Sequence, residues 1–192
     1  MSRRTALIVV DVQNDFCPGG SLPVPDGDGV VSVINNMMLT DDYAVKVATL
    51  DWHKDPGDHF GNPPDYVNSW PRHCEIGTPG ALPHPGIDQE LVHIWFMKGQ
   101  YEPAYSGFQG KSLRGIPLET HLRRNDITDV VIVGLATDFC VKATALDAVR
   151  LGFATSVHLP ACRGIAAAVG ESDTLTLALE EMRAAGIILV SS

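Results

Sequence analysis

Long runs of apolar residues recur along the chain and alternate with segments of helical periodicity. The apolar runs predict strands at residues 6–11, 44–51, 91–98, 130–133, 153–159 and 187–190. Helical spacing predicts helices at residues 30–39, 117–124, 141–151 and 173–185. Continuous apolar runs are typical of parallel strands that are buried on both faces. The pattern therefore predicts an α/β fold, with a doubly wound, mainly parallel six-stranded sheet and helices on both faces.

Residues 52–90 interrupt this regular pattern. They are rich in proline, glycine, histidine and aspartate and have little periodicity. A loop of this length inside a compact domain is usually functional or disordered, and its aromatic residues are untypical of disorder. The 192 residues are enough for one domain with a substantial core and too few for two ordinary ones. We therefore expect a single domain over residues 1–192, with a site-building excursion at 52–90.

Charge and cysteine usage narrow the class of protein. The formal net charge of −9 and the absence of a basic cluster argue against a nucleic-acid partner, which requires grouped lysines and arginines. The N-terminal apolar run ends at Asp11 and is too short for a membrane span or a signal segment. Cys17, Cys74, Cys140 and Cys162 are scattered without a CxxC pair, which favours reduced thiols and a cytoplasmic location.

Chemically capable side chains stand at the ends of the predicted strands. Asp11, Asp51 and Lys98 each close a strand, and Cys140 follows the end of another. In open α/β sheets the carboxyl ends of the strands form the ligand-binding crevice. Each residue alone could be structural, with Asp11 as a cap, Lys98 as a solvated terminus and Cys140 as packing. Their convergence on one edge favours a catalytic interpretation.

Cys140 lies between a predicted strand and a predicted helix. Thr137 or Asp138 is expected to be the N-cap, which places Cys140 in the first helical turn. A thiol there is close to the positive end of the helix dipole, which favours thiolate. The alternative is that Cys140 is a small buried hydrophobe, as most free cysteines are.

A nucleophilic thiol needs groups that move protons and stabilise charge. Lys98 close to Cys140 would lower the thiol pKa, and Asp11 could take the thiol proton and later protonate a leaving amine. The backbone N–H groups of Ala136 and Cys140 are candidates for an oxyanion hole. This set of roles predicts attack on a carboxamide.

A second cluster of donors lies in the 52–90 excursion. Asp51 and His53 stand two residues apart on an extended chain end, and His59 and His73 follow. One carboxylate and three imidazoles suit a divalent Zn, Fe or Mn ion and do not distinguish among them. A lone loop histidine is more often a surface residue, and Cys74 beside His73 is expected to pack. We assign no ligand role to the remaining histidines, His84, His93, His121 and His158.

Several motifs together resemble the nicotinamidases/pyrazinamidases of the isochorismatase-like (cysteine) hydrolase family. They are Ile-Val-Val-Asp-Val-Gln-Asn-Asp-Phe at 8–16, Asp-Trp-His at 51–53, Gly-Asp-His-Phe at 57–60, Ser-Trp-Pro at 69–71 and Gly-Leu-Ala-Thr-Asp-Phe-Cys-Val at 134–141. The first is shared across a wider superfamily. The Asp-Trp-His motif combined with the cysteine turn is more specific, and the match covers nearly the whole chain.

The resemblance implies roles for individual residues. It implies a catalytic triad of Asp11, Lys98 and Cys140, and a divalent metal on Asp51, His53 and His73, with His59 as a further ligand. It also implies a cis peptide near Leu135–Ala136 that directs the Ala136 and Cys140 N–H groups into one oxyanion hole. Phe16 and Trp70 resemble aromatic walls of a substrate pocket, with Ala104 and Tyr105 also lining it.

The resemblance also implies a reaction. We expect hydrolysis of nicotinamide to nicotinate and ammonia through a thioester on Cys140, with pyrazinamide as a second small-molecule substrate. The metal is expected to bind the pyridine nitrogen. Two alternatives stay open: a metal-free amidase acting on carbamoyl or ureido compounds, and a non-catalytic metalloprotein that binds a pyridine ligand. Phe139 stands where related sequences are expected to have histidine, which leaves pocket polarity and substrate preference open.

Overall fold

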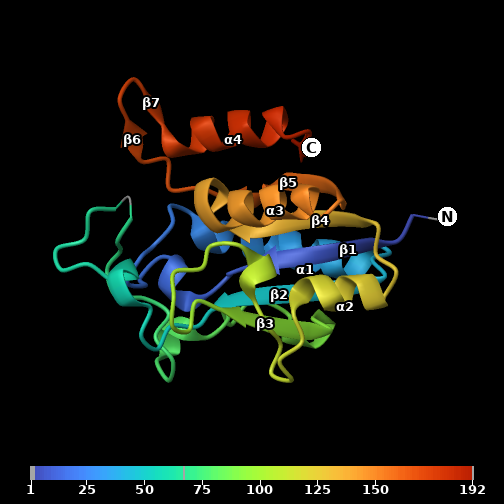
Figure 1. Cartoon of the computed structure of the whole chain (residues 1–192), viewed down its shortest axis with the longest axis horizontal. Helices are drawn as coiled ribbons and strands as arrows, with labels where there is room; N and C mark the ends of the chain where they lie inside the picture. Colours follow the sequence, from blue (N-terminus) through green and yellow to red (C-terminus); the bar gives the residue numbers. More distant parts are fainter. Residues whose placement is uncertain (1–2, 67, 192) are drawn as a thin grey trace.

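The computed structural model describes residues 3–66 and 68–191. Residues 1, 2, 67 and 192 of the predicted domain lie outside this part. The strands of the main sheet are β1 Thr5–Val10, β2 Val45–Asp51, β3 Ile94–Lys98, β4 Asp129–Leu135, β5 Ala154–Arg163 and β8 Ile188–Val190. The helices are α1 Val31–Thr40, α2 Leu118–Arg124, α3 Lys142–Arg150 and α4 Thr174–Ala184 (Figure 1).

The main sheet is six-stranded with the order β3-β2-β1-β4-β5-β8, and each neighbouring pair is parallel. β1 lies in the middle, and the chain winds outward from it in both directions. The predicted doubly wound parallel sheet is thereby confirmed. The strand order reverses between β1 and β4, and crevices for ligands form at such a reversal.

Alternate residues of β1 point into two separate cores. Ala6 and Ile8 pack with α2, α3 and α4, whereas Leu7 and Val9 pack with α1. Figure 1 accordingly shows α1 on one side of the sheet and α2 and α3 on the other. The absence of polar residues within the run at residues 6–10 follows from this, because both faces of the strand are covered.

Some element boundaries differ from the prediction. β3 begins later than expected because Asp88 accepts a hydrogen bond from the Glu90 N–H and stabilises a 3-10 turn, η5 Gln89–Leu91. β5 runs past the predicted end at residue 159 because its pairing with β4 shifts register and resumes at Cys162. A small antiparallel pair, β6 Ala168–Val169 and β7 Ser172–Asp173, was not predicted.

The described part of the 52–90 excursion is ordered by main-chain hydrogen bonds. His53 N–H donates to the Cys74 carbonyl, and the Trp70 N–H donates to the carbonyl of His59. Helical structure there is limited to 3-10 turns, including η3 Gly57–His59 and η4 Pro79–Ala81. These bonds fold the excursion back over the end of β2, so Trp70 and three of its histidines, His53, His59 and His73, reach the edge of the sheet.

The sequence predicts that the chain has no membrane span and that its cysteines are reduced. In the described residues, no helix is long and apolar enough to cross a membrane. Cys17, Cys74, Cys140 and Cys162 are free and buried.

Gly134, in β4, occupies a position that only glycine tolerates. Its φ is +116°, and a Cβ there would lie 2.1 Å from the Val10 carbonyl oxygen of β1. We expect Gly134→Ala to lower the free energy of unfolding by about 4 kcal/mol or more, because the central strands would have to separate. Gly152→Ala is the matched control, since Gly152 also has a positive φ but a Cβ there meets open space.

The Gly152→Ala variant is expected to lose only about 1 kcal/mol from backbone strain. Urea denaturation of the two variants measures the difference. Equal losses would contradict the explanation from close strand packing.

Candidate active site

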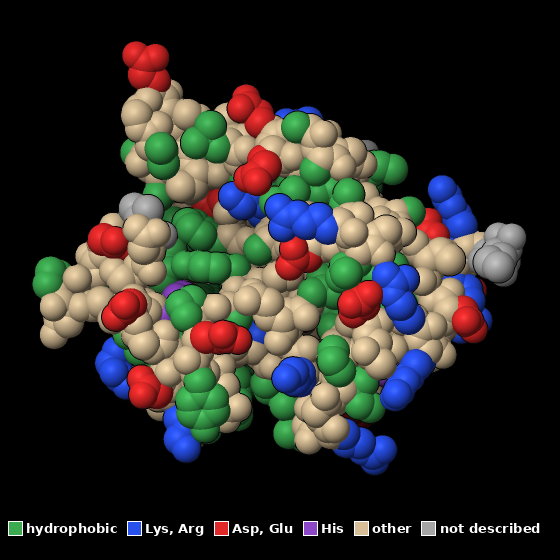
Figure 2. All heavy atoms as spheres, in the orientation of Figure 1, with side chains coloured by type: hydrophobic (Ala, Val, Ile, Leu, Met, Phe, Trp, Pro, Cys, Tyr) green, Lys and Arg blue, Asp and Glu red, His purple; other side chains and the backbone are tan. Residues whose placement is uncertain are grey.

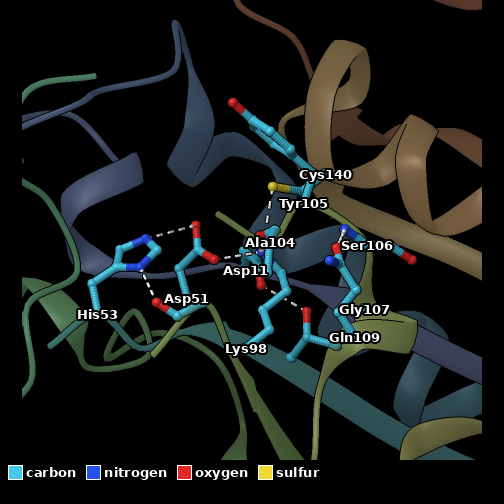
Figure 3. Close-up of polar contacts among 12 residues, drawn as sticks. Asp11, Asp51, His53, Lys98, Ala104, Tyr105, Ser106, Gly107, Gln109 and Cys140 are labelled. Atoms are coloured by element: carbon cyan, nitrogen blue, oxygen red, sulfur yellow. Dashed lines mark hydrogen bonds and ion pairs between the residues drawn. The ribbon is translucent and has the colours of Figure 1, made fainter. Parts of the chain in front are cut away.

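The ends of four adjacent strands bring the predicted catalytic residues together. Asp11 directly follows β1, Asp51 ends β2, Lys98 ends β3, and the chain leaving β4 reaches Cys140. Because β3, β2, β1 and β4 are neighbours and parallel, their carboxyl ends form one edge. Figure 3 shows the Lys98 side chain between the two aspartates, with its amine directed toward Cys140.

Lys98 is the centre of this group. Its Nζ lies 2.9 Å from Asp11 Oδ2, 2.5 Å from Asp51 Oδ1 and 3.5 Å from the Cys140 Sγ. It also donates to the Ala104 carbonyl at 2.9 Å. The Lys98 side chain has no solvent exposure, so these partners replace water around the ammonium. Such a charge is tolerated in the interior only when it is paired and hydrogen-bonded.

Asp11 is fixed by its neighbour on β2. The Thr49 hydroxyl donates to Asp11 Oδ1 at 2.7 Å, and the Asp11 N–H donates to the Thr49 carbonyl at 3.2 Å. The backbone of Asp11 is left-handed, with φ +49°. These bonds occupy one carboxylate oxygen and leave Oδ2 facing Lys98.

The pKa values of the two aspartates diverge. Burial raises the pKa of Asp11, although Lys98 opposes that shift. For Asp51, burial is outweighed by Lys98 and the neighbouring histidines, and the pKa lies below its usual range. Two carboxyl groups whose pKa values are shifted in opposite directions are suited to different tasks. Asp11 is the one suited to carry a proton.

The expected low pKa of Cys140 is wrong. Burial raises the pKa of the thiol well above its usual value, and the opposing effect of the Lys98 ammonium does not compensate. Helix position alone suggested thiolate because sequence does not reveal how completely a side chain is removed from water. The raised pKa favours the thiol form of Cys140, so we expect that its use as a nucleophile requires a nearby base to take its proton.

Cys140 lies in a π-helical turn, η7 Thr137–Val141, that leads into α3. Its position in the first turn is confirmed, but the predicted N-cap is wrong: Thr137 and Asp138 lie inside the turn and Ala136 occupies the cap position. The peptide between Leu135 and Ala136 is cis, as the family resemblance implies.

Three histidines from the excursion form a compact group beside the triad. His53, His59 and His73 are buried, and each offers a ring nitrogen within 4.8 Å of the others. Asp51 Oδ2 lies 3.6 Å from His53 Nε2 and 3.9 Å from His73 Nε2. The four residues predicted as metal ligands are therefore adjacent in the structure.

The donor set fits a divalent metal. His53 Nε2 and His59 Nδ1 are buried and have no hydrogen-bond partner among the described residues. His53 Nδ1 lies 2.6 Å from the Gly99 carbonyl and His73 Nδ1 lies 2.7 Å from the Pro71 carbonyl, so their Nε2 atoms are free to ligate. Burial, together with His53 and His73, lowers the pKa of His59 to about 4, which keeps it in the neutral form that binds metals.

Asp51 connects the two groups. Its Oδ1 contacts Lys98 and its Oδ2 faces the histidines. Gln13 fixes its main chain, because the Gln13 amide donates to the Asp51 carbonyl and accepts from the Asp51 N–H, both at 2.8 Å. Sequence reasoning missed Gln13 and Thr49, since a polar residue near a strand end gives no sign of which side chain it holds.

A cavity opens beside Cys140 and the histidines. It encloses about 370 Å³ between atoms, open solvent at its mouth included. Its walls are Phe16, Leu22, Val24, Asp51, His59, Trp70, His73, Tyr105, Ala136, Phe139, Cys140 and Ile165. In Figure 2, apolar side chains gather in a hollow between the excursion at the left and the β6–β7 end of α4.

Most of the predicted pocket residues line this cavity. Phe16, Trp70 and Tyr105 do so, and the Trp70 Nε1–H donates to the Tyr105 hydroxyl at 2.9 Å. Ala104 does not line it in the described structure, because its contribution is the carbonyl that holds Lys98. Phe139 packs edge-on against Trp70, with ring centroids 4.9 Å apart, and adds an aromatic wall.

Other lining residues were not predicted. Leu22, Val24 and Ile165 come from loops, where an apolar residue shows no periodic signal. Ile165 belongs to residues 160–170, for which the sequence suggested no site. The sequence signal available in hindsight is an isolated large apolar residue in an otherwise polar or small-residue loop.

A thiol, a buried ammonium and a carboxylate beside a group of imidazoles define a class: a thiol-dependent hydrolase with a metal-binding site on a doubly wound sheet. The chain belongs to the isochorismatase domain family, whose model matches residues 5–192. It is 50% identical over 188 residues to the nicotinamidase/pyrazinamidase of Mycobacterium tuberculosis, covering 97% of this chain and 98% of that protein.

Solved structures agree with this assignment. The pyrazinamidase of Pyrococcus horikoshii in complex with zinc is 39% identical, with a TM-score of 0.79 and coverage of 98% of this chain and 99% of that one. PnC1 from L. infantum in complex with nicotinate is 30% identical, with a TM-score of 0.85 and coverage of 100% and 94%. The chain is similar to both over its whole length.

The orphaned imidazole nitrogens lead to a prediction about metal binding. We expect His59→Ala to weaken zinc binding about tenfold or more, because one ligand of the group is lost. The stabilisation that zinc gives the folded protein should fall accordingly. Zinc content after dialysis and the zinc-induced shift in Tm are the measurements.

His84→Ala is the control for this variant. His84 belongs to the same excursion, but its Nδ1 accepts a hydrogen bond from the Gly86 N–H instead of facing the histidine group. An unchanged zinc response in His59→Ala would exclude His59 from the ligand set.

Proposed function

We propose that this protein is a metal-dependent cysteine amidohydrolase that converts nicotinamide to nicotinate and ammonia, and pyrazinamide to pyrazinoate. The observation that carries the proposal is the contact of one buried ammonium, Lys98 Nζ, with both Asp11 and the Cys140 sulfur. The similarity to nicotinamidases/pyrazinamidases over nearly the whole chain supports the substrate class. The nicotinate bound to PnC1 supports a pyridine ligand.

The first half of the reaction forms a thioester. Asp11 takes the thiol proton at Oδ2, the oxygen that Thr49 does not occupy, and the Cys140 sulfur attacks the carboxamide carbon. The N–H groups of Ala136 and Cys140 stabilise the oxyanion that develops. Asp11 then returns the proton to the leaving nitrogen, the C–N bond breaks, and ammonia departs.

The second half releases the acid. A water molecule loses a proton to Asp11 and its oxygen attacks the thioester carbon. The C–S bond breaks, and the Cys140 sulfur recovers a proton from Asp11. The acid leaves with the second proton of the water molecule and loses it to solvent, which gives nicotinate. Lys98 stays protonated throughout, because Asp11 and Asp51 raise its pKa well above the usual value despite burial. It holds Asp11 in place and stabilises charge on the sulfur.

Asp51, His53, His59 and His73 would hold the metal, a divalent Zn, Fe or Mn ion. When bound, the ion supplies a coordination site for the pyridine nitrogen and orients the ring. The chain's aromatic residues Phe16, Trp70 and Tyr105 enclose that ring, and Ala104 acts indirectly through Lys98. We also propose a cytoplasmic location, which the free thiols support.

The nucleophile is tested by Cys140→Ala. We expect ammonia release from nicotinamide to fall at least about 10⁴-fold, because no other group can form the thioester. Cys162→Ala is the matched control: Cys162 is also buried, but its sulfur donates to the His158 carbonyl. Folding of both variants is checked by circular dichroism. A Cys140→Ala protein with an undiminished rate would exclude the thiol mechanism.

Metal removal separates the proposed function from its alternatives. We expect chelation to reduce nicotinamide turnover and added zinc, iron or manganese to restore it. Indifference to chelation would favour a metal-free amidase that acts on carbamoyl or ureido compounds. Pyridine binding without ammonia release would instead indicate a non-catalytic metalloprotein.

A further inference from the structure

The Asp138 carboxylate joins the nucleophile turn to a distant segment. Asp138 is buried and lies two residues before Cys140. Its Oδ1 accepts from the Ile165 N–H at 3.0 Å, and its Oδ2 accepts from the Ala166 N–H at 3.0 Å and from the Thr174 hydroxyl at 2.5 Å. One side chain therefore connects η7, residues 164–167 and the start of α4.

The conformation of residues 164–167 depends on this carboxylate. Ala166 has a left-handed backbone, with φ +54°, which is unfavourable for a residue other than glycine. A Cβ on Gly164 would lie 3.2 Å from Asp138 Oδ1 and 2.9 Å from Leu175 Cδ1, so the segment passes very close to the carboxylate. A strained backbone persists where its surroundings determine it from several sides.

Thr174 reinforces the same connection from α4. Its hydroxyl accepts from the Ala167 N–H at 3.0 Å while it donates to Asp138, and its own N–H donates to the Ala167 carbonyl at 2.9 Å. The main-chain donors of three consecutive residues, 165 to 167, are thus satisfied by Asp138 and Thr174. Removing either side-chain acceptor would leave partly buried N–H groups without their present partner.

This network holds Ile165, and Ile165 lines two separate hollows. On one side it lines the cavity beside Cys140. On the other it lines a second hollow, together with Leu22, Tyr66, Trp70 and Ala167 among others. Leu22 and Trp70 also line both hollows, so these two residues and Ile165 together form the boundary between them. Of the three, Ile165 is the one whose main-chain N–H is held by Asp138.

We propose that Ile165 is a specificity-determining residue and that Asp138 and Thr174 are the positioning residues that hold it. The inference rests on the proposed function and adds a limit on substrate size, which Ile165 sets. An unsubstituted heteroaromatic carboxamide fits the cavity, whereas a ring that carries an extra methyl group toward Ile165 does not. Asp138 acts on the ring wall and not on the reacting atoms.

Thr174→Val tests the positioning role without substituting a residue of the nucleophile turn η7. It removes the hydroxyl that joins Asp138 to Ala167. We expect KM for nicotinamide to rise roughly tenfold, with kcat within about threefold of the wild-type value, because loss of an apolar ring contact weakens binding by this order. Thr174→Ser keeps the hydroxyl and should restore KM.

Thr176→Val is the matched control. It is the same substitution in the same turn of α4, but Thr176 is exposed and its hydroxyl donates to the cap residue Asp173. Its kinetics should equal those of the wild type. Tm is recorded for every variant, so that a general loss of stability is recognised.

Ile165→Ala and the double variant establish whether Thr174 acts through Ile165. Ile165→Ala should raise KM to a similar extent, and Thr174→Val combined with Ile165→Ala should raise it no further than the larger single effect. Both single variants should also raise kcat/KM for at least one of the 2-, 4-, 5- and 6-methylnicotinamides relative to nicotinamide.

Four results would overturn the proposal. Multiplicative effects in the double variant would mean that Thr174 and Ile165 act independently. An unchanged preference among the methylnicotinamides in both single variants would exclude a size limit at Ile165. If Thr174→Val does not fold, Ile165→Val, which removes one methyl group and leaves the network intact, must still shift that preference. A wild-type protein that releases no ammonia from nicotinamide overturns the proposed function, and this inference with it.

Discussion

One buried ammonium determines how the site is built. Removing a charge such as Lys98 Nζ from water costs several kcal/mol, so the fold must supply oxygen partners from several directions. Here they come from the loop after β1, the end of β2 and the carbonyl of Ala104. The parallel sheet makes this possible, because it ends its central strands at one edge.

The two carboxylates beside this ammonium have pKa values that are shifted in opposite directions. Lys98 and the imidazoles lower the pKa of Asp51 despite its burial, whereas burial raises the pKa of Asp11. The Thr49 hydroxyl occupies Oδ1 of Asp11 and leaves Oδ2 toward Lys98. Gln13 holds the main chain of Asp51. Charge, burial and hydrogen bonding thus give two identical functional groups opposite pKa shifts, which suit the roles we propose for them: a proton carrier and a permanent anion.

Much of this arrangement was predictable from sequence, for a physical reason. Fully apolar strands identify a parallel sheet, and a parallel sheet brings polar residues at its strand ends together, as for Asp11, Asp51 and Lys98. Asp138 shows the limit. A carboxylate near the start of a helix accepts hydrogen bonds from N–H groups, but the sequence does not say which residues donate them. Asp138 was expected to cap its own helix, and it instead accepts from the N–H groups of Ile165 and Ala166. Likewise, the burial that raises the pKa of Cys140 depends on packing by residues far away in the chain.

The two oxygens of Asp51 have a consequence for how this enzyme can be dissected. One oxygen contacts the Lys98 ammonium and the other faces the imidazoles that we propose hold the metal, so we expect a substitution at this residue to perturb both groups at once. Loss of activity in such a variant cannot be read as loss of metal alone. By the same token, a protein that replaced Asp51 to alter the ion site would also lose one of the two carboxylates that pair the Lys98 ammonium.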